Sequence, residues 1–374
     1  MRTQPPGPNF IPKTPDSDTA RKFSDAAWLM QMALSISTAL TDLSQKIVIY
    51  WTLATHSLPH QRIFPLLELL GKLGTGKSQT LSAIYNFAYH PLRISLRGMT
   101  GPAIRDKFAE CYEGTAVVEE ADHAWKDKEM RFEHLLSDRY QRTSAEASKM
   151  VPAGENEWVI ATKQYFGATA LHRRISFHDA AMDGRTVIVR FHADHTRKYQ
   201  EYSDQDPWNV DGKSLIGEIT FEPPTVEKPE GVAGRIFNTY KPLLSAAKLC
   251  GDDDFVRQLL PKLLQETLEL KEAQSSEPDS LVLRAIVEAI FSVGTAKFQN
   301  IKLSALGKLI WDIHRFPLQP RQIGALARDL GFETKTSHGV TVVVPTPATL
   351  LRACDECEYT DEAIEELKKV VRTT

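Results

Sequence analysis

Apolar positions follow helical spacing near the start of the chain and then recur as five short runs. Between residues 22 and 57, the spacing of Trp28, Met32 and Ile36 is typical of the two helices that we predict there. Strands separated by helical stretches predict an α/β fold, with a parallel sheet covered on both faces. The five runs that predict buried strands are 63–71, 93–96, 115–121, 157–163 and 185–191.

The second half of the chain has a mostly helical pattern. Residues 233–273 carry a purely helical signal, which is followed by a linker rich in polar residues. Beyond it, helices are predicted at 281–291, 303–315 and 320–330, before a two-stranded ribbon around Gly339. Three helices and a ribbon in this order resemble a winged helix.

Residues 71–78 fit the pattern G-x-x-x-x-G-K-[ST] of a phosphate-binding loop (P-loop), between a predicted strand and a predicted helix. Glycines let backbone N–H groups surround phosphate oxygens, Lys77 reaches the terminal phosphates and Ser78 ligates Mg²⁺. A glycine turn with a solvated lysine is the alternative, which the strand-to-helix context disfavours. The predicted ATP-binding residues of the loop are Gly71, Gly74, Thr75, Gly76, Lys77, Ser78 and Gln79.

The apolar run at 115–121 ends in two carboxylates, Glu119 and Glu120. We predict that Glu119 binds Mg²⁺ together with Ser78, and that Glu120 polarises the attacking water. Solvated acids at a strand end are the alternative. Thr162, with Gln164 as an alternative, is predicted to end the fourth strand and to contact the water or the γ-phosphate.

The order of P-loop, acidic strand, polar strand end and arginine before a fifth strand resembles the AAA+ branch of P-loop ATPases. More narrowly, TAVVEEAD, HDAAMDGRTVIVRF and GRIFNTYKPLLSAAKLCGDD look like helicase-like ATPases encoded in phages, plasmids and integrated elements, often with primase modules. The resemblance covers 63–264 and implies a five-stranded parallel sheet, a helical lid, ATP and Mg²⁺, and a homo-oligomer such as a hexameric ring. It also implies a primase or another element-encoded enzyme as a partner.

The resemblance assigns roles to arginines as well. Arg185 matches the arginine that a ring-forming ATPase presents to the γ-phosphate of a neighbouring subunit. Arg235 matches a cis arginine that reports nucleotide state to the lid. Arg173 and Arg174 compete with Arg185, and surface salt bridges are the alternative for all four. Glu119 stands where that family has aspartate, so slower hydrolysis is expected.

The implied organisation is a disordered lead, N-terminal helices, a P-loop ATPase core, a connection with a helical lid, and a winged-helix domain with an acidic tail. The corresponding ranges are 1–21, 22–60, 61–195, 196–275 and 276–374.

The C-terminal segment carries a local basic patch. Residues 297–340 contain seven lysines and arginines against three acids. In a winged helix, helix 320–330 would enter a DNA groove, although contacts to protein alone are the alternative. The predicted DNA contacts are Arg321, Gln322, Arg328 and Lys335, with Gln319 and His338 beside them.

Arg139, Arg142 and Lys149 lie between the acidic strand and the predicted fourth strand. In a ring, an insertion at this place can line a central pore and bind a nucleic-acid backbone. An ordinary solvated helix end is the interpretation that we favour slightly.

Composition narrows the remaining choices. The 374 residues have a formal net charge of -3, so contact with nucleic acid must come from a local patch. Four cysteines are too few for a disulfide framework, and the pair Cys354 and Cys357 lacks a second pair of zinc ligands. The early apolar runs are too short for a membrane span, so we expect a soluble, cytoplasmic protein.

Two functional hypotheses remain. The first is an oligomeric, ATP-driven DNA helicase or replication motor of a mobile genetic element. The second is a nucleotide-dependent regulator or assembly factor, in which ATP sets the oligomeric state. A small-molecule kinase is disfavoured by the arginine pattern and the winged helix.

Overall fold

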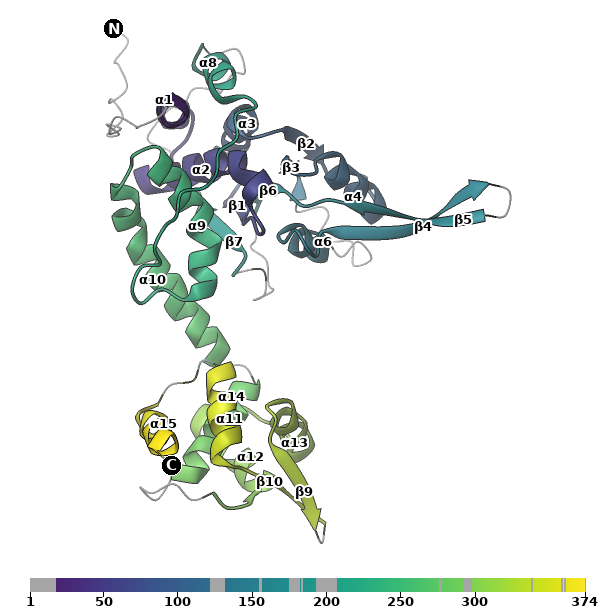
Figure 1. The fold of residues 1–374 in the computed structure, drawn as a ribbon, viewed down its shortest axis with the longest axis vertical. Coiled ribbons are helices and arrows are strands. Elements are labelled where there is room, and N and C mark those ends of the chain that lie inside the picture. The colour runs from purple at the N-terminus through teal and green to yellow at the C-terminus, as the bar shows by residue number, and fades with distance from the viewer. Residues whose placement is uncertain are drawn as a thin grey trace. The chain divides into compact units, whose positions relative to one another are not determined.

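The chain forms two compact units, Met1–Thr267 and Leu268–Thr374 (Figure 1). The computed structural model describes residues 18–121, 132–154, 157–174, 182, 184–192, 207–275, 278–291, 298–337, 339–357, 359 and 361–373. The predicted disordered lead 1–21 is too long, because the first helix begins at Asp18, and residues 1–17 lie outside the described residues.

The helices of the first unit are α1 (Asp18–Ser37), α2 (Asp42–Ala54), the 3₁₀ helix η1 (Thr55–His60), α3 (Lys77–Phe87), α4 (Gly101–Glu110), α6 (Phe132–Arg139), α8 (Pro207–Ile216) and α9 (Gly234–Leu249). Helix α10 (Asp254–Ser275) begins in this unit and ends in the second. Its strands are β1 (Leu66–Leu70), β2 (Pro91–Ser95), β3 (Thr115–Glu119), β4 (Glu146–Gly154), β5 (Glu157–Gln164), β6 (Ala168–Arg173) and β7 (Thr186–Arg190).

A five-stranded sheet, in the order β2-β3-β6-β1-β7, forms the centre of the first unit. All of its pairings are parallel, so all five strands end at one edge, the carboxyl edge, and begin at the other, the amino edge. Every residue of β1 is buried, and successive side chains point to opposite faces of a strand. Both faces of the sheet are therefore covered at β1, as predicted, whereas the edge strand β2 is partly exposed.

The predicted fourth strand, 157–163, does not belong to this sheet. It forms β5, which pairs with β4 in a separate antiparallel hairpin. The hairpin extends away from the sheet in Figure 1, and its base is linked to α4 by an ion pair of 2.9 Å between Lys163 and Asp106. The fourth strand of the sheet is β6 instead, which begins only four residues after Gln164.

Buried polar contacts connect the N-terminal helices to the sheet. Trp51 Nε1 on α2 donates to the carbonyl oxygen of Pro65 at 3.0 Å, immediately before β1. His56 lies between the carbonyl oxygens of Phe87, at the end of α3, and of Ile219, at 3.0 and 2.7 Å. These contacts fix both the strand that enters residues 71–78 and the helix that leaves them.

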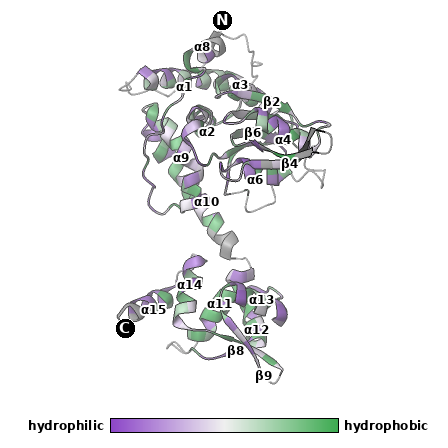
Figure 2. Ribbon diagram, turned by 45° about the vertical axis from the view of Figure 1, so that its right-hand side comes forward, coloured by the Kyte–Doolittle hydropathy of each residue, from purple (hydrophilic) through white to green (hydrophobic). Residues whose placement is uncertain are grey.

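The second unit contains α11 (Pro278–Phe291), β8 (Ile301–Lys302), α12 (Leu303–His314), α13 (Pro320–Asp329), β9 (Glu333–Ser337), β10 (Val340–Val344), α14 (Pro347–Glu356) and α15, which runs from Glu362 to Thr373. An antiparallel sheet in the order β8-β10-β9 packs beside the helices. The apolar residues of α11 and α12 that Figure 2 shows in green form the core of this unit.

Candidate nucleotide-binding site

Residues 71–78 lie at the junction between β1 and α3, as the P-loop pattern requires. Gly74 and Gly76 have φ angles of 74° and 91°, which residues with a Cβ rarely adopt. The loop starts at the carboxyl edge of the sheet, because the Gly71 N–H continues the ladder to the Arg173 carbonyl oxygen at 3.1 Å. The fold therefore presents backbone N–H groups at the beginning of a helix, where an anion is stabilised.

Lys77 points into this loop. Its side chain is buried, and Nζ donates to the carbonyl oxygen of Gly71 at 2.6 Å and to that of Lys72. Thr75 is also buried and donates to the Lys72 carbonyl oxygen at 2.9 Å, whereas Ser78 is exposed at the start of α3. The ammonium group thus already lies where the loop would surround a phosphate, and the residues fit ATP with Mg²⁺.

Glu119 and Glu120 lie at the same edge of the sheet. Glu119 is the last residue of β3, and Glu120 follows with a φ of 57°, a left-handed conformation that is uncommon for glutamate. One strand, β6, separates β3 from β1, so the two strand ends are roughly 10 Å apart. A group bound at residues 71–78 can therefore lie within reach of both carboxylates. Asp122 lies outside the described residues.

The prediction that Thr162 ends a sheet strand is wrong. Thr162 and Gln164 lie on β5 in the hairpin, and Thr162 shares an exposed hydrogen bond of 2.9 Å with Ser148. The strand that ends between β1 and β3 is β6, with His172 and Arg173 as its last residues. Sequence reasoning missed His172, which is half-buried at this strand end, pairs in register with Leu69 and lies one residue beyond the pair of Val118 and Leu171.

Arg173 cannot reach a neighbouring subunit. Its side chain is buried and lies 3.8 Å from the Glu68 carboxylate, which β1 holds inside the sheet. This pair lies inside the sheet close to residues 71–78, because Arg173 is in register with Leu70, the residue before Gly71. Arg174 is exposed at the carboxyl edge, the opposite edge from Arg185, and stays an alternative to it.

Arg185 and Arg235 lie together at the amino edge. The carbonyl oxygen of Arg185 accepts from the N–H of Leu66, the first residue of β1. That edge is roughly 16 Å from Gly71, the rise of five strand residues. The side chain of Arg235 packs against Gly184, where an added Cβ would overlap its guanidinium. The prediction that Arg235 contacts the nucleotide of its own subunit is therefore wrong, because α9 meets the opposite edge of the sheet.

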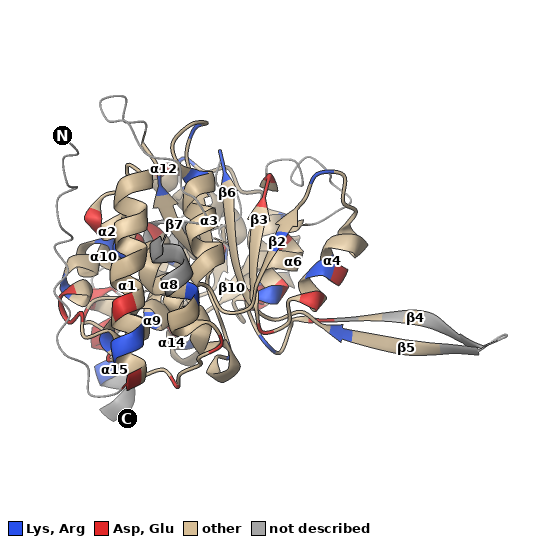
Figure 3. Cartoon of the chain, turned by 90° about the horizontal axis from the view of Figure 1, so that it is seen from above, with Lys and Arg blue, Asp and Glu red and all other residues tan. Residues whose placement is uncertain are grey.

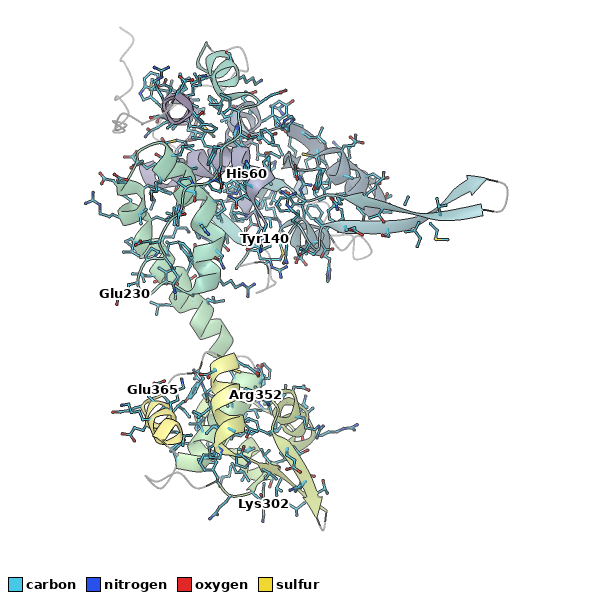
Figure 4. The ribbon with its side chains drawn as sticks, in the orientation of Figure 1. His60, Tyr140, Glu230, Lys302, Arg352 and Glu365 are labelled. Atoms are coloured by element: carbon cyan, nitrogen blue, oxygen red, sulfur yellow. The ribbon has the colours of Figure 1, made fainter. Side chains whose placement is uncertain are left out.

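Tyr140, which Figure 4 labels, follows α6 and is close enough to both arginines to feel their charges. Its ring is 5.6 Å from the Arg185 guanidinium, which also donates to Ser137 Oγ. Burial raises the pKa of Tyr140, while the charges of Arg185 and Arg235 oppose this shift. The three side chains form one cluster, which we call the arginine cluster.

Arg139 and Arg142 donate to main-chain oxygens of their own subunit, which disfavours both as pore residues. The favoured interpretation, a solvated helix end, is wrong for Arg139, because its side chain is buried. The buried Arg139 guanidinium donates to the carbonyl oxygens of Cys111, Gly114 and Ala168 at 3.0 to 3.2 Å, as well as to others. Arg142 binds the chain before β1, with donors 2.8 Å from the Leu58 oxygen. Nothing is described of the Lys149 side chain.

In the second unit, α13 exposes Arg321 and Arg328, and Arg328 donates to Thr334 Oγ1 at 3.2 Å. The side chain of Gln322 caps its own helix, because its Oε1 accepts from the Gln319 N–H at 2.9 Å in a capping box. Lys335 on β9 pairs with Glu333 at 3.3 Å. The predicted contact His338 lies outside the described residues.

The described residues contain no group of three or more His, Cys, Asp and Glu side chains arranged to hold a metal ion. Burial raises the pKa of the Cys354 thiol to about 12, which disfavours the thiolate that zinc requires. Among all the residues that the structure describes, no helix is both long and apolar enough to cross a membrane.

No protein-family model and no curated protein matches the chain. A solved structure described as "SCCmec type IV Cch - active helicase" is similar at 14% sequence identity and a TM-score of 0.43, over 91% of this chain and 75% of that one. A likeness at that score carries no argument about function.

Proposed function

We propose that this chain is an ATP-hydrolysing, ring-forming AAA+ protein that acts on DNA, as a helicase or replication-type motor of a mobile genetic element. The observation that carries the proposal is the junction between β1 and α3, with Lys77 inside the loop and two carboxylates across β6. A phosphate loop with acids at the neighbouring strand ends is the arrangement that nucleotide hydrolysis needs.

In this proposal each side chain has a distinct task at the carboxyl edge. Lys77 and the N–H groups of residues 71–78 hold the terminal phosphates, and Ser78 and Glu119 hold Mg²⁺. The metal ion neutralises charge on the phosphate oxygens. Glu120 orients a water molecule and accepts its proton, and His172 at the end of β6 is a further contact to that water.

The arginine cluster supports a ring. It lies too far from residues 71–78 to assist hydrolysis within one subunit, so Arg185 and Arg235 act on the nucleotide of a neighbour. A guanidinium supplied in this way stabilises the charge that develops on the transferred phosphoryl group. In this proposal Arg235 changes from a cis to a trans role.

The β4–β5 hairpin is the proposed DNA-contacting element of the ring. Three residues join the hairpin to β6, which lies between β1 and β3 in the sheet. A movement of β6 would therefore be transmitted to the hairpin. Figure 3 shows no charge along the described middle of β5, and Met150, Val159 and Ile160 are 58%, 49% and 69% exposed. Contacts from these residues would be to bases and sugars and not to phosphates.

The second unit is proposed to be a winged helix that places the motor on DNA. The order of helix, short strand, two helices and a ribbon supports this assignment. Arg321, Arg328 and Lys335 are its proposed DNA contacts, whereas the Gln322 side chain caps α13.

The exposed apolar residues of the hairpin also favour the second hypothesis, a nucleotide-dependent regulator, because such residues often mark a surface for a protein partner. ATP turnover and the separation of a forked DNA duplex distinguish the two functions. For the motor we expect DNA to stimulate turnover and strands to separate, with Lys77→Ala abolishing both. Stimulation without separation favours the regulator, and equal turnover by wild type and Lys77→Ala overturns both.

A further inference from the structure

The first unit contains a cavity of about 310 Å³ that is separate from residues 71–78. Three segments line it: the chain that leads into β1, the connection before α9, and one side of α9. The lining residues are His60, Gln61, Arg62, Ile63, Pro223, Pro224, Thr225, Asn238, Lys241, Pro242 and Ser245. Figure 4 labels His60 at this place, beside the N-terminal helices.

The cavity has the chemistry of an anion site. His60, Arg62 and Lys241 are exposed basic residues, and none of the described residues that line the cavity is acidic. None of the ion pairs found among the described residues involves these three side chains. Uncompensated positive charge around a concave surface attracts a phosphate or carboxylate group.

The walls of the cavity are held in place without a ligand. The Ser245 hydroxyl donates to the Pro224 carbonyl oxygen at 3.0 Å, and Lys248 Nζ donates to the Thr225 oxygen at 2.9 Å. On the other side, Arg142 Nε donates to the Gln61 oxygen at 3.0 Å, and its N–H donates to the Arg62 oxygen at 2.9 Å. A ligand therefore meets a preformed site, which lowers the entropic cost of binding.

The size and the apolar lining indicate more than a simple anion. A volume of about 310 Å³ lies at the lower end of the range for small-molecule pockets and is much larger than a phosphate group needs. Ile63, Pro223 and Pro224 provide apolar walls, and the Asn238 amide can hydrogen-bond a base or sugar.

We propose that this cavity binds a single nucleotide unit, with its phosphate between Arg62 and Lys241 and its base against the prolines. The unit is either a free nucleoside monophosphate or the 5′-phosphorylated end of a DNA strand. This site is distinct from residues 71–78 and does not depend on the proposed hydrolysis.

Calorimetry on the full chain carrying Lys77→Ala, which weakens nucleotide binding at residues 71–78, tests the proposal. The probes are thymidine monophosphate, inorganic phosphate, and a short thymidine oligonucleotide with or without a 5′-phosphate. Adding Arg62→Ala and Lys241→Ala should weaken binding of the monophosphate at least about tenfold, because two charged hydrogen-bond donors are lost. The matched control is Lys107→Ala with Arg257→Ala, which removes the same charge from exposed helix positions.

The control variant should bind as the Lys77→Ala chain does, and Asn238→Leu should weaken the monophosphate but not inorganic phosphate. Equal binding of the free monophosphate and the phosphorylated oligonucleotide identifies a site for a free nucleotide. Binding of the phosphorylated oligonucleotide identifies a strand end if it is lost both without the 5′-phosphate and in the variant with Arg62→Ala and Lys241→Ala. The proposal is overturned by equal loss in the control, by absence of binding to every nucleotide probe, or by inorganic phosphate binding as tightly as the monophosphate.

Discussion

The two edges of the central sheet differ in the charge that they carry. The carboxyl edge holds residues 71–78 with the acids Glu119 and Glu120, and the amino edge holds the arginine cluster. Five residues of β1, roughly 16 Å, separate them. An arginine that assists hydrolysis from such a distance can do so only in another subunit. If these arginines assist hydrolysis, the protein must therefore be an oligomer when it is active.

The two edges also differ in how they are stabilised. At the carboxyl edge, Lys77 donates to loop carbonyl oxygens that a phosphate would replace, so its contacts can be exchanged on binding. At the amino edge, Arg185 and Arg235 rest on Tyr140, Ser137 and Gly184 of their own subunit. These contacts of Lys77 therefore lie within one loop, whereas those of Arg185 and Arg235 are made to residues from other segments of the fold.

The largest effect is expected from Arg185→Ala, which removes the main charge of the amino edge. We expect ATP turnover to fall by about 10³-fold or more, because an arginine that acts in trans contributes that much to phosphoryl transfer. ATP binding, measured with a fluorescent analogue, should stay unchanged because the carboxyl edge remains intact.

Mixing Arg185→Ala with Lys77→Ala should restore part of the turnover. In a mixed ring, the Lys77→Ala subunit presents its arginine to an intact site of the Arg185→Ala subunit. Neither variant has activity alone, so any recovery requires a shared site. Unchanged turnover in Arg185→Ala, or no recovery in the mixture of two well-folded variants, contradicts the difference between the edges.

Glu120→Gln changes the carboxyl edge and should reduce turnover by about 10²- to 10⁴-fold, the contribution of a general base. The glutamine keeps the shape of the side chain and removes the proton acceptor. Single-turnover measurements should show that ATP binds normally and that the chemical step is slow. A matched change, Glu113→Gln, removes an acid that pairs with Arg142 and lies at the amino end of β3, and it should leave the chemical step intact.

Much of the carboxyl edge could be predicted from the sequence. Residues 71–78 form a local pattern, and the apolar runs before and after it placed β1 and β3 correctly. The pattern could not show which strand lies between them. β5 and β6 are both short apolar runs, with only residues 165–167 between them, and membership of a sheet is decided by pairing with distant strands.

The amino edge could not be placed from local patterns. The sequence positions Arg235 at the start of a helix, but the edge that this helix meets depends on the packing of α9 against α2 and β7. In contrast, a signal for the capping role of Gln322 was present: Gln319 and Gln322 have the spacing of a capping box before an apolar run. The sequence could therefore predict a contact between residues three positions apart, but not the edge of the sheet that α9 meets.

Gly184→Ala should have a smaller effect, because it moves a side chain of the arginine cluster without removing it. The added Cβ would overlap Arg235 and displace its guanidinium. We expect turnover to fall by about 10²-fold, since a displacement of this size costs alignment with the reacting group. Thermal unfolding measured in parallel shows whether the fold is retained, and Gly217→Ala is the control at an exposed helix end. Equal turnover in both variants would show that Arg235 is not used in catalysis.

The smallest effect is expected from Thr162→Val. If Thr162 ended a sheet strand beside the phosphates, loss of its hydroxyl would reduce turnover as strongly as Glu120→Gln does. Because it lies on the exposed hairpin, where its hydroxyl shares a hydrogen bond with Ser148, turnover should stay within about twofold of wild type. His172→Ala, at the end of β6, should instead slow the chemical step. The reverse result for the two variants would place the hairpin, and not β6, beside the nucleotide.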